Sequence, residues 1–204
     1  MGFYGEQILP RATDKLLGNR EFAKLRRELC TGLRGDVIEI GFGSGLNVPF
    51  LPAEVTGLWA VEPSAVAHKL ATKRVAASPV PVHVAGLDGA QLDAPDARFD
   101  AAVSTMTLCT IPDVVGALRE LRRVLKPGAE FHFAEHGHAP DERVARRQDQ
   151  LNGLQRRIAG GCNLNREIAP LLTEAGFEIE AVRNFYLQGP KPWSYMYLGR
   201  ARNP

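Results

Sequence analysis

Residues 36–45 read Asp-Val-Ile-Glu-Ile-Gly-Phe-Gly-Ser-Gly, and an acidic residue, Glu62, follows 21 positions after Gly41. The apolar start of this stretch predicts a short buried strand, and glycine then occupies every second position. Glycine lets the chain turn sharply and removes side chains where a ligand must lie against the backbone. A carboxylate at the end of the next strand can accept hydrogen bonds from both ribose hydroxyls. The stretch therefore predicts a pocket for an adenosine-containing cofactor, with a turn built from Gly41, Gly43 and Gly45.

The glycine spacing separates two kinds of adenosine-binding fold. A dinucleotide fold requires the spacing G-x-G-x-x-G, whereas this chain has Leu46 at the last of those positions. The frame from Glu39 through the three glycines instead resembles motif I of the class I S-adenosylmethionine-dependent methyltransferases. In that family an acidic residue at the position of Glu39 lies near the methionine end of the cofactor. A glycine-rich turn that binds nothing is the alternative.

The chain has 204 residues and a net charge of +2, which suit one domain with a substantial core and require no nucleic-acid partner. Its three cysteines are widely spaced and lack the C-x-x-C pattern. We therefore expect neither a disulfide framework nor a structural zinc site. No segment has the composition of a signal peptide, and no apolar run approaches the roughly 20 residues of a transmembrane helix. These features predict a cytoplasmic protein in which residues 1–204 form a single domain.

Strand and helix patterns alternate along the chain, which predicts an α/β fold with a doubly wound, mostly parallel sheet and helices on both faces. The predicted strands are 36–40, 57–62, 80–85, 99–105, 130–135, 177–186 and 194–202, with no helix between the last two. The predicted helices are 20–33, a short one after Gly45, 65–77, one capped by Asp113, one within 139–165, and 166–175. Residues 1–18 are expected to form an irregular or partly helical arm, and Arg26 is expected on the outer side of its helix.

The resemblance to the methyltransferase family extends over nearly the whole chain. Residues 99–105, 118–128 and 167–177 are similar to the family's fourth strand, the helix and turn before its fifth strand, and its final helix. The subgroup that the chain resembles is the small, UbiE/Methyltransferase-11-like and thiol-methyltransferase-like enzymes, which share a phrase similar to Gly160-Gly161-Cys162-x-Leu164-x-Arg166. The resemblance implies a seven-stranded sheet of order 3-2-1-4-5-7-6 whose last strand is antiparallel. It also implies S-adenosylmethionine as cofactor and S-adenosylhomocysteine as product.

Cofactor-binding residues are expected at the carboxyl ends of the parallel strands, where such sheets bind ligands. Glu62 is predicted to bind the ribose, and the alternative is that it caps the following helix. Glu39 is predicted near the methionine end, or else it hydrogen-bonds strand and loop amides. Asp88 and the amide of Gly89 are predicted to contact adenine, with an Asx turn as the alternative. Thr105, in the loop after the fourth strand, completes the predicted set.

His136 and His138 follow the fifth strand beside the expected methyl position, and either could be a general base or substrate-orienting residue, with His136 as the catalytic candidate. A polar loop histidine is the alternative for each. A methyltransferase of this kind needs no obligatory catalytic residue, because the methyl group is already activated and alignment does most of the work. His132, His136 and His138, with Cys162 as a fourth ligand, suggest a metal site. However, strand residues four apart lie roughly 13 Å apart, which is too far for one ion. We therefore expect no metal.

The sequence predicts transfer of a methyl group from S-adenosylmethionine to a small-molecule or lipid-like acceptor. A non-catalytic S-adenosylmethionine-binding regulatory protein is the alternative, and Leu46 disfavours an NAD(P)-dependent oxidoreductase. Acceptor recognition is expected from the arm at 1–18 and from a substrate-side insertion at 139–165. The arginines of that insertion are typical of a solvated helix face, which leaves a peripheral contact with an acidic membrane open. The sequence indicates no oligomeric state.

Overall fold

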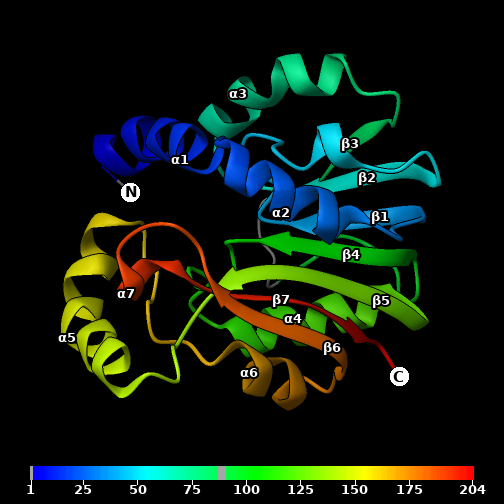
Figure 1. Ribbon diagram of the computed structural model, residues 1–204. Coiled ribbons are helices and arrows are strands. Elements are labelled where there is room, and N and C mark those ends of the chain that lie inside the picture. The colour runs from blue at the N-terminus through cyan, green and yellow to red at the C-terminus, as the bar shows by residue number, and fades with distance from the viewer. Residues whose placement is uncertain (1, 87–90) are drawn as a thin grey trace.

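A computed structural model describes residues 2–86 and 91–204, and it contains a seven-stranded sheet of order β3-β2-β1-β4-β5-β7-β6 (Figure 1). The strands are β1 (Gly35–Ile40), β2 (Val55–Val61), β3 (Val82–Gly86), β4 (Phe99–Thr105), β5 (Leu125–His136), β6 (Glu178–Tyr186) and β7 (Tyr195–Arg202). β7 runs antiparallel to both β5 and β6, and the other neighbouring strands pair in parallel. The predicted fold class, strand order and antiparallel last strand are confirmed.

Helices cover both faces of this sheet. They are η1 (Tyr4–Ile8), α1 (Leu9–Leu17), α2 (Arg20–Cys30), η2 (Val48–Phe50), α3 (Ala65–Ala76), α4 (Val114–Val124), α5 (Glu142–Ile158), α6 (Ile168–Glu174) and α7 (Lys191–Ser194). The helices α2 and α3 contribute to one hydrophobic core, and α4 and α6 contribute to the other (Figure 1). The sheet is therefore doubly wound.

The central strand β1 shows how the sequence builds these two cores. Side chains alternate between the faces of a strand, and Val37 packs in the core of α2 and α3 while Ile38 and Ile40 pack in the opposite core. All three side chains are buried. A strand that is apolar on both faces belongs in the interior of a parallel sheet, and this places the end of β1, where the glycine turn begins, at the centre of the molecule.

Local signals set the helix boundaries, with two departures from the sequence-based expectation. Ser64 and Asp113 cap α3 and α4 through their side chains, as predicted. A four-residue helix, α7, separates the last two strands, contrary to the expectation of a direct hairpin. It begins at Lys191 with a proline in its first turn, where proline's missing N–H costs nothing. The helix expected after Gly45 is reduced to the single 3-10 turn η2.

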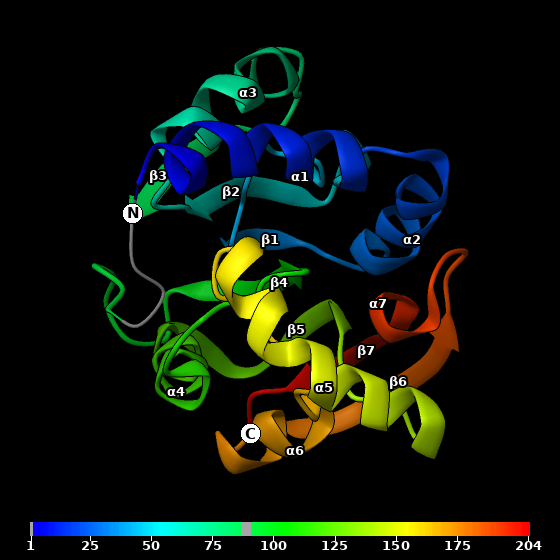
Figure 2. The same ribbon diagram turned by 90° about the vertical axis from the view of Figure 1, so that its left-hand side faces the viewer.

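The carboxyl ends of the parallel strands lie on the left of Figure 1, and Figure 2 looks onto that edge. The helices α1 and α5 lie in front of the strand ends in this view. The arm at 1–18 is thus helical over most of its length, and the insertion at 139–165 contains the longest helix among the described residues. Among the described residues, no helix combines the length and apolar character that crossing a membrane requires.

Candidate functional site

The glycine turn after β1 has a backbone that only glycine adopts without strain. Gly41 and Gly43 have φ values of 73° and 56°, in the left-handed region that side chains disfavour. A Cβ atom on Gly41 would in addition overlap the side chain of Thr107, which follows β4. The turn is therefore packed directly against the loop after β4, and the predicted need for glycine has a steric cause at Gly41.

Glu62, at the end of β2, holds this turn in place. Its Oε2 accepts a hydrogen bond from the Gly43 amide at 2.8 Å, and its Oε1 accepts one from the Ser64 amide at 2.8 Å. The contact with Ser64 is the helix-capping interaction that the sequence left as an alternative. Each carboxylate oxygen can accept more than one hydrogen bond, so both retain capacity for a ribose hydroxyl. The ribose contact itself stays a prediction.

Glu39 is a buried carboxylate, and one of its two oxygens has no hydrogen-bond partner among the described residues. Its side chain is 1% exposed, and Oε1 accepts a hydrogen bond from Asn47 Nδ2 at 2.8 Å. Oε2 has no hydrogen-bond partner among the described residues. Burial raises the pKa of Glu39 to about 8, against the opposing effects of the Asn47 hydrogen bond and the Arg26 charge. An unpaired buried carboxylate oxygen fits a cationic ligand group, such as the ammonium of a bound amino acid.

Arg26 lies near Glu39, and its position corrects the sequence-based expectation of an outward side chain. Arg26 is 3% exposed, and one of its terminal nitrogens donates to the Leu17 carbonyl at 2.8 Å. Its Nε has no partner among the described residues. Burial lowers the pKa of Arg26 to about 10, while the Glu39 charge opposes that change. The helix was read by its apolar stripe, and an arginine that lies over the Phe22 ring on that stripe was missed.

Asn47 connects the glycine turn to the end of β4, and the sequence pattern did not point to it. Its side chain is 1% exposed and donates both to Glu39 and to Thr105 Oγ1, the latter at 2.9 Å. Thr105 is therefore in the same buried group as Glu39, although its predicted contact with the cofactor is untested. Asp88 and Gly89, the predicted adenine contacts, lie outside the described residues.

The N-terminal arm is joined to the glycine turn and to the insertion. Asp14 of α1 accepts a hydrogen bond from Ser44 Oγ at 2.6 Å and pairs with Arg74 of α3 at 2.9 Å. Nearer the N-terminus, the Tyr4 hydroxyl donates to the carbonyl of Ile158, at the end of α5, at 2.8 Å. The two segments that the sequence assigned to acceptor recognition thus meet at the carboxyl-end edge (Figure 2).

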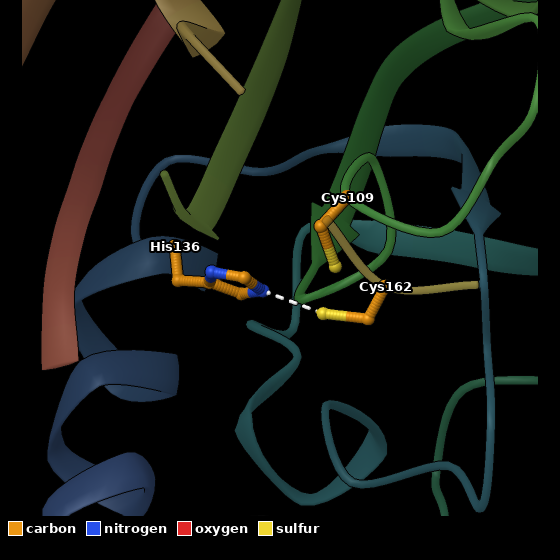
Figure 3. A group of neighbouring side chains, drawn as sticks. All are labelled: Cys109, His136 and Cys162. Atoms are coloured by element: carbon orange, nitrogen blue, oxygen red, sulfur yellow. Dashed lines mark hydrogen bonds between the residues drawn. The ribbon is translucent and has the colours of Figure 1, made fainter. Parts of the chain in front are cut away.

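Three side chains from different parts of the chain converge beyond the ends of β4 and β5: Cys109, His136 and Cys162 (Figure 3). His136 Nε2 lies 3.0 Å from the sulfur of Cys162, and all three are buried. A hydrogen bond from Cys109 and the neighbouring His136 ring hold the pKa of Cys162 well below its usual range. The same interaction with Cys162, together with burial, raises the pKa of Cys109.

The other two histidines that the sequence singled out are not in this group. His132 Nδ1 lies 2.7 Å from the Leu29 carbonyl, and its Nε2 lies 3.0 Å from Glu130. His138 is near carboxylates instead, 4.0 Å from Asp149 and 3.9 Å from Glu167. The sequence argument that the strand separates His132 from His136 therefore agrees with their different partners.

Glu135 is a further buried carboxylate that the sequence analysis did not single out. It is 0% exposed and accepts hydrogen bonds from Ser104 Oγ at 2.7 Å, the Thr107 amide at 2.8 Å and the Leu108 amide at 3.1 Å. Burial raises the pKa of Glu135 to about 7, although these hydrogen bonds oppose the change. The carboxylate fixes a loop that turns sharply at Met106, whose φ is 55°. Glu135 is thus a structural anchor for the residue that follows this loop, Cys109.

Comparisons with known proteins indicate the family of the chain. A family model described as "Methyltransferase domain" matches residues 38–133. Thiol S-methyltransferase TMT1B of Homo sapiens is 32% identical over 89% of this chain and 77% of its own length. Thiol S-methyltransferase TMT1A of Homo sapiens is 29% identical over 86% of this chain and 75% of its own length.

Solved structures share the fold at lower sequence identity. The N-methyltransferase NodS from Bradyrhizobium japonicum, in complex with S-adenosylhomocysteine, superposes with a TM-score of 0.73 at 19% identity, over 98% of both chains. A possible histamine N-methyltransferase from Thermotoga maritima superposes with a TM-score of 0.71 at 21% identity, also over 98% of both chains. At this identity the likeness concerns the fold alone.

Proposed function

The chain belongs to the class I S-adenosylmethionine-dependent methyltransferases, and we propose that it methylates a small thiol-bearing acceptor. Membership makes it an enzyme with S-adenosylmethionine as cofactor, which replaces both the regulatory and the oxidoreductase alternatives. The acceptor class is the proposed part. The observation that carries it is the sulfur- and imidazole-containing group of Cys109, His136 and Cys162 at the acceptor side. The thiol S-methyltransferases that the chain resembles over most of both lengths support it.

The residues around the glycine turn fit the cofactor by charge. S-adenosylmethionine supplies a methyl group bonded to a positively charged sulfur and carries an amino acid ammonium and carboxylate. We assign the ammonium to the unpaired Oε2 of Glu39 and the carboxylate to Arg26, whose Nε is also unpaired among the described residues. Glu62 is assigned to the ribose from its place at the end of β2.

The order of the strands then places the acceptor. Glu62 follows β2, and Glu39 lies at the end of β1, so the cofactor's two ends are assigned to these neighbouring strands. The next strands in the sheet, β4 and β5, carry the loops of Cys109 and His136. In-line displacement requires the nucleophile on the far side of the methyl group from the sulfonium. We therefore place the acceptor's sulfur beside Cys109, His136 and Cys162.

A thiol suits this site better than a hydroxyl does. The thiolate is the nucleophilic form, and a free thiol has a pKa of about 8.5, so modest assistance ionises it near neutral pH. A hydroxyl acceptor requires a committed general base. The predicted base, His136, has its Nε2 directed at Cys162, so we set aside its role as a base for a hydroxyl acceptor. His136 remains our candidate for acceptor positioning.

The helices α1 and α5 are our candidates for covering the acceptor. They belong to segments that are joined by the Tyr4–Ile158 hydrogen bond and lie in front of the strand ends. A lipid-like thiol is compatible with this arrangement, and we keep a peripheral membrane contact through the arginines of α5 as a proposal. The three reduced cysteines are consistent with the cytoplasmic location that we also propose. Strands from β1 to β7 form a single sheet, which supports the proposal that residues 1–204 form one domain.

The acceptor class is tested by supplying methyl-labelled S-adenosylmethionine with matched thiol, amine, quinol and phospholipid acceptors and identifying products by mass spectrometry. We expect a labelled thioether and no comparable product from the amine or quinol. The Glu39→Gln variant serves as the control for cofactor-dependent turnover. Labelled amine or quinol products in the absence of any thioether would refute the thiol assignment and leave the family assignment intact.

A further inference from the structure

We propose that Cys109, His136 and Cys162 bind one thiophilic divalent cation, with Zn²⁺ as the representative ion, and that this cation holds the acceptor's sulfur as a thiolate. The first half concerns these three side chains alone. The second half rests on the proposed function, since it requires a thiol acceptor. The sequence-based expectation was that no metal binds, so the proposal departs from it.

The three candidate ligand atoms are close to the arrangement that a tetrahedral ion requires. One nitrogen or sulfur atom from each residue lies within 4.8 Å of the other two, and His136 Nε2 is 3.0 Å from the Cys162 sulfur. Zinc binds sulfur at about 2.3 Å and nitrogen at about 2.0 Å, which places tetrahedral ligands roughly 3.5–3.8 Å apart. Shifts of under about 1 Å would therefore bring all three atoms onto one ion.

The two cysteines are held together by bonds that do not involve their sulfur atoms. The carbonyl of Cys109 accepts hydrogen bonds from both the backbone amide and the side chain of Asn163, each at 2.9 Å. Glu135 anchors the loop before Cys109, and Arg166 donates to the Leu108 carbonyl in the same loop. The pair is thus preorganised by its surroundings, as second-shell contacts orient metal ligands.

The ligand set leaves room for an external ligand. Catalytic zinc sites have three protein ligands and an open fourth position, and two cysteines with one histidine is one such set. The nearby buried carboxylate of Glu135 is already engaged by Ser104 and by the loop amides, so it is not available as a fourth ligand. Cys162 keeps 8% of its surface exposed, which leaves this end of the group nearest to solvent.

A cation at this position would supply the assistance that a thiol acceptor needs. The acceptor's S–H loses its proton to solvent as its sulfur joins the ion. That thiolate forms a C–S bond to the methyl carbon while the bond from carbon to the sulfonium breaks, and its electron pair stays on the leaving sulfur. The product thioether is a weaker ligand than a thiolate, which favours its release. No oxidant or reductant is required.

The sequence predicts no metal because His132 and His136 lie too far apart along one strand to share an ion. Cys109 is not part of the set of three histidines and Cys162 to which that prediction applies. Cys109 joins His136 and Cys162 because the loop after β4 turns back at Met106. Two metal-free arrangements compete with the proposal: a disulfide between Cys109 and Cys162, and a proton-sharing pair of Cys162 and His136.

The direct test uses Co²⁺, which substitutes for zinc and reports thiolate ligands through a charge-transfer absorption band. The protein is prepared under reducing conditions, stripped of metal and titrated with Co²⁺ and then with Zn²⁺. We expect one cobalt per chain, a thiolate band that Zn²⁺ abolishes, and a change in the band when a small thiol acceptor is added. The same measurements are made on Cys109→Ser, Cys162→Ser and His136→Asn, each checked for folding by circular dichroism, and each should lose stoichiometric binding.

Matched controls are available within the chain. Cys30 is a buried cysteine outside the group, and His138 is a histidine with other neighbours, so Cys30→Ala and His138→Asn should keep the cobalt band. A wild-type protein that gives no thiolate band, or the same band in the cysteine variants, would overturn the proposal. Recovery of a Cys109–Cys162 disulfide with no metal under reducing conditions would also overturn it. The wild-type spectrum decides the matter even where a variant fails to fold.

Methyl transfer gives a second, independent measure. At pH 7 a free thiol of pKa about 8.5 is roughly 3% ionised, so loss of a metal that ionises it fully should slow the reaction about 30-fold. The deficit of Cys162→Ser should shrink as the pH rises above about 8.5, where the acceptor ionises unaided, with S-adenosylhomocysteine affinity unchanged. A deficit independent of pH would overturn acceptor activation. Metal binding without any thiol methylation would refute the proposed function and leave the metal site standing, whereas thiol methylation by metal-free protein would do the reverse.

Discussion

Replacing Glu39 by Gln should raise the free energy of unfolding of the cofactor-free protein and lower its affinity for the cofactor. Burial raises the pKa of Glu39 to about 8 from an ordinary value of 4.5. A carboxyl group whose folded pKa is raised contributes its full stability below the unfolded value and loses it as the pH rises toward the folded value. At pH 7.5 the folded state retains a proton that the unfolded chain has released. The three units between 4.5 and 7.5 correspond to a cost of about 4 kcal/mol at about 1.4 kcal/mol per unit.

With the cofactor bound, Glu should be favoured over Gln at position 39. We assign the unpaired Oε2 of Glu39 to the cofactor's ammonium, and a hydrogen bond to a charged group contributes about 1.5–3 kcal/mol. Glu39→Gln keeps the shape of the side chain and the acceptor for Asn47 Nδ2 but removes the charge. S-adenosylhomocysteine should therefore bind roughly 10- to 150-fold more weakly to the variant.

Two measurements separate these effects. Urea unfolding without cofactor gives the free energy of unfolding of the wild type and of Glu39→Gln at pH 5 and at pH 7.5. Any pH-independent effect of the new amide on stability is the same at both pH values, so it cancels when the two stability differences are subtracted. The stability advantage of the variant should grow by about 3 kcal/mol between the two conditions. Calorimetry then gives the affinity for S-adenosylhomocysteine. A constant stability difference together with unchanged affinity would refute the reasoning and identify Glu39 as an ionised structural partner of Arg26.

Three further predictions concern the turn and the arm. Glu62→Gln leaves one acceptor oxygen where the carboxylate has two, so the side chain can no longer accept hydrogen bonds from both amides and the ribose. Calorimetry should show S-adenosylhomocysteine affinity reduced at least about tenfold, and unchanged affinity would mean that Glu62 only supports the loop. Gly41→Ala adds a Cβ that overlaps Thr107 at a left-handed φ, and it should unfold at lower temperature by several degrees, roughly 1–3 kcal/mol of stability; an unaltered melting curve would contradict the packing. Tyr4→Phe removes the hydrogen bond to α5 and should raise the KM for the acceptor at unchanged cofactor affinity, while an unchanged KM would remove the arm from the acceptor site.

The glycine turn and its contact with Glu62 were predictable because their determinants are local. Most of the strand, the glycine turn and Glu39 lie within residues 36–45, and Glu62 directly follows the next strand. Parallel pairing of β1 with β2 then brings the turn and Glu62 together without information from elsewhere in the chain. The hydrogen bond from Gly43 to Glu62 is the consequence of that pairing.

Arg26 and Asn47 could not be predicted because apolar periodicity and glycine spacing do not identify buried polar residues. A helical stripe is identified by its apolar members, and Arg26 lies at the edge of such a stripe, where its guanidinium reaches the Phe22 ring and the Leu17 carbonyl. Arginine's apolar stem permits this burial. Asn47 is two residues beyond Gly45, and only the three-dimensional approach of Thr105 and Glu39 gives its amide two partners.

The group of two cysteines and one histidine at the proposed acceptor side could not be predicted from the spacing of its residues in the sequence. Cys109, His136 and Cys162 come from the loop after β4, the end of β5 and the turn after α5, and no local motif joins them. His136 and Cys162 each attracted attention separately, yet their contact depends on where α5 ends and how the chain returns to the sheet. A search for cysteine and histidine residues at the carboxyl ends of neighbouring strands is the sequence signal that would have found His136 with Cys109.

The loop after β4 is the physical link between the two halves. Thr105, the last residue of β4, is tied through Asn47 to Glu39, Thr107 in the loop packs against Gly41, and the loop then leads to Cys109. Its left-handed residue costs roughly 1–3 kcal/mol, and the hydrogen bonds from its amides to the buried Glu135 offset that cost. Methyl transfer depends on aligning a nucleophile with a methyl group at near-attack distance. A single short loop packs against the glycine turn and leads to Cys109. In the function that we propose, this loop would set the alignment of acceptor and methyl group with few adjustable parts.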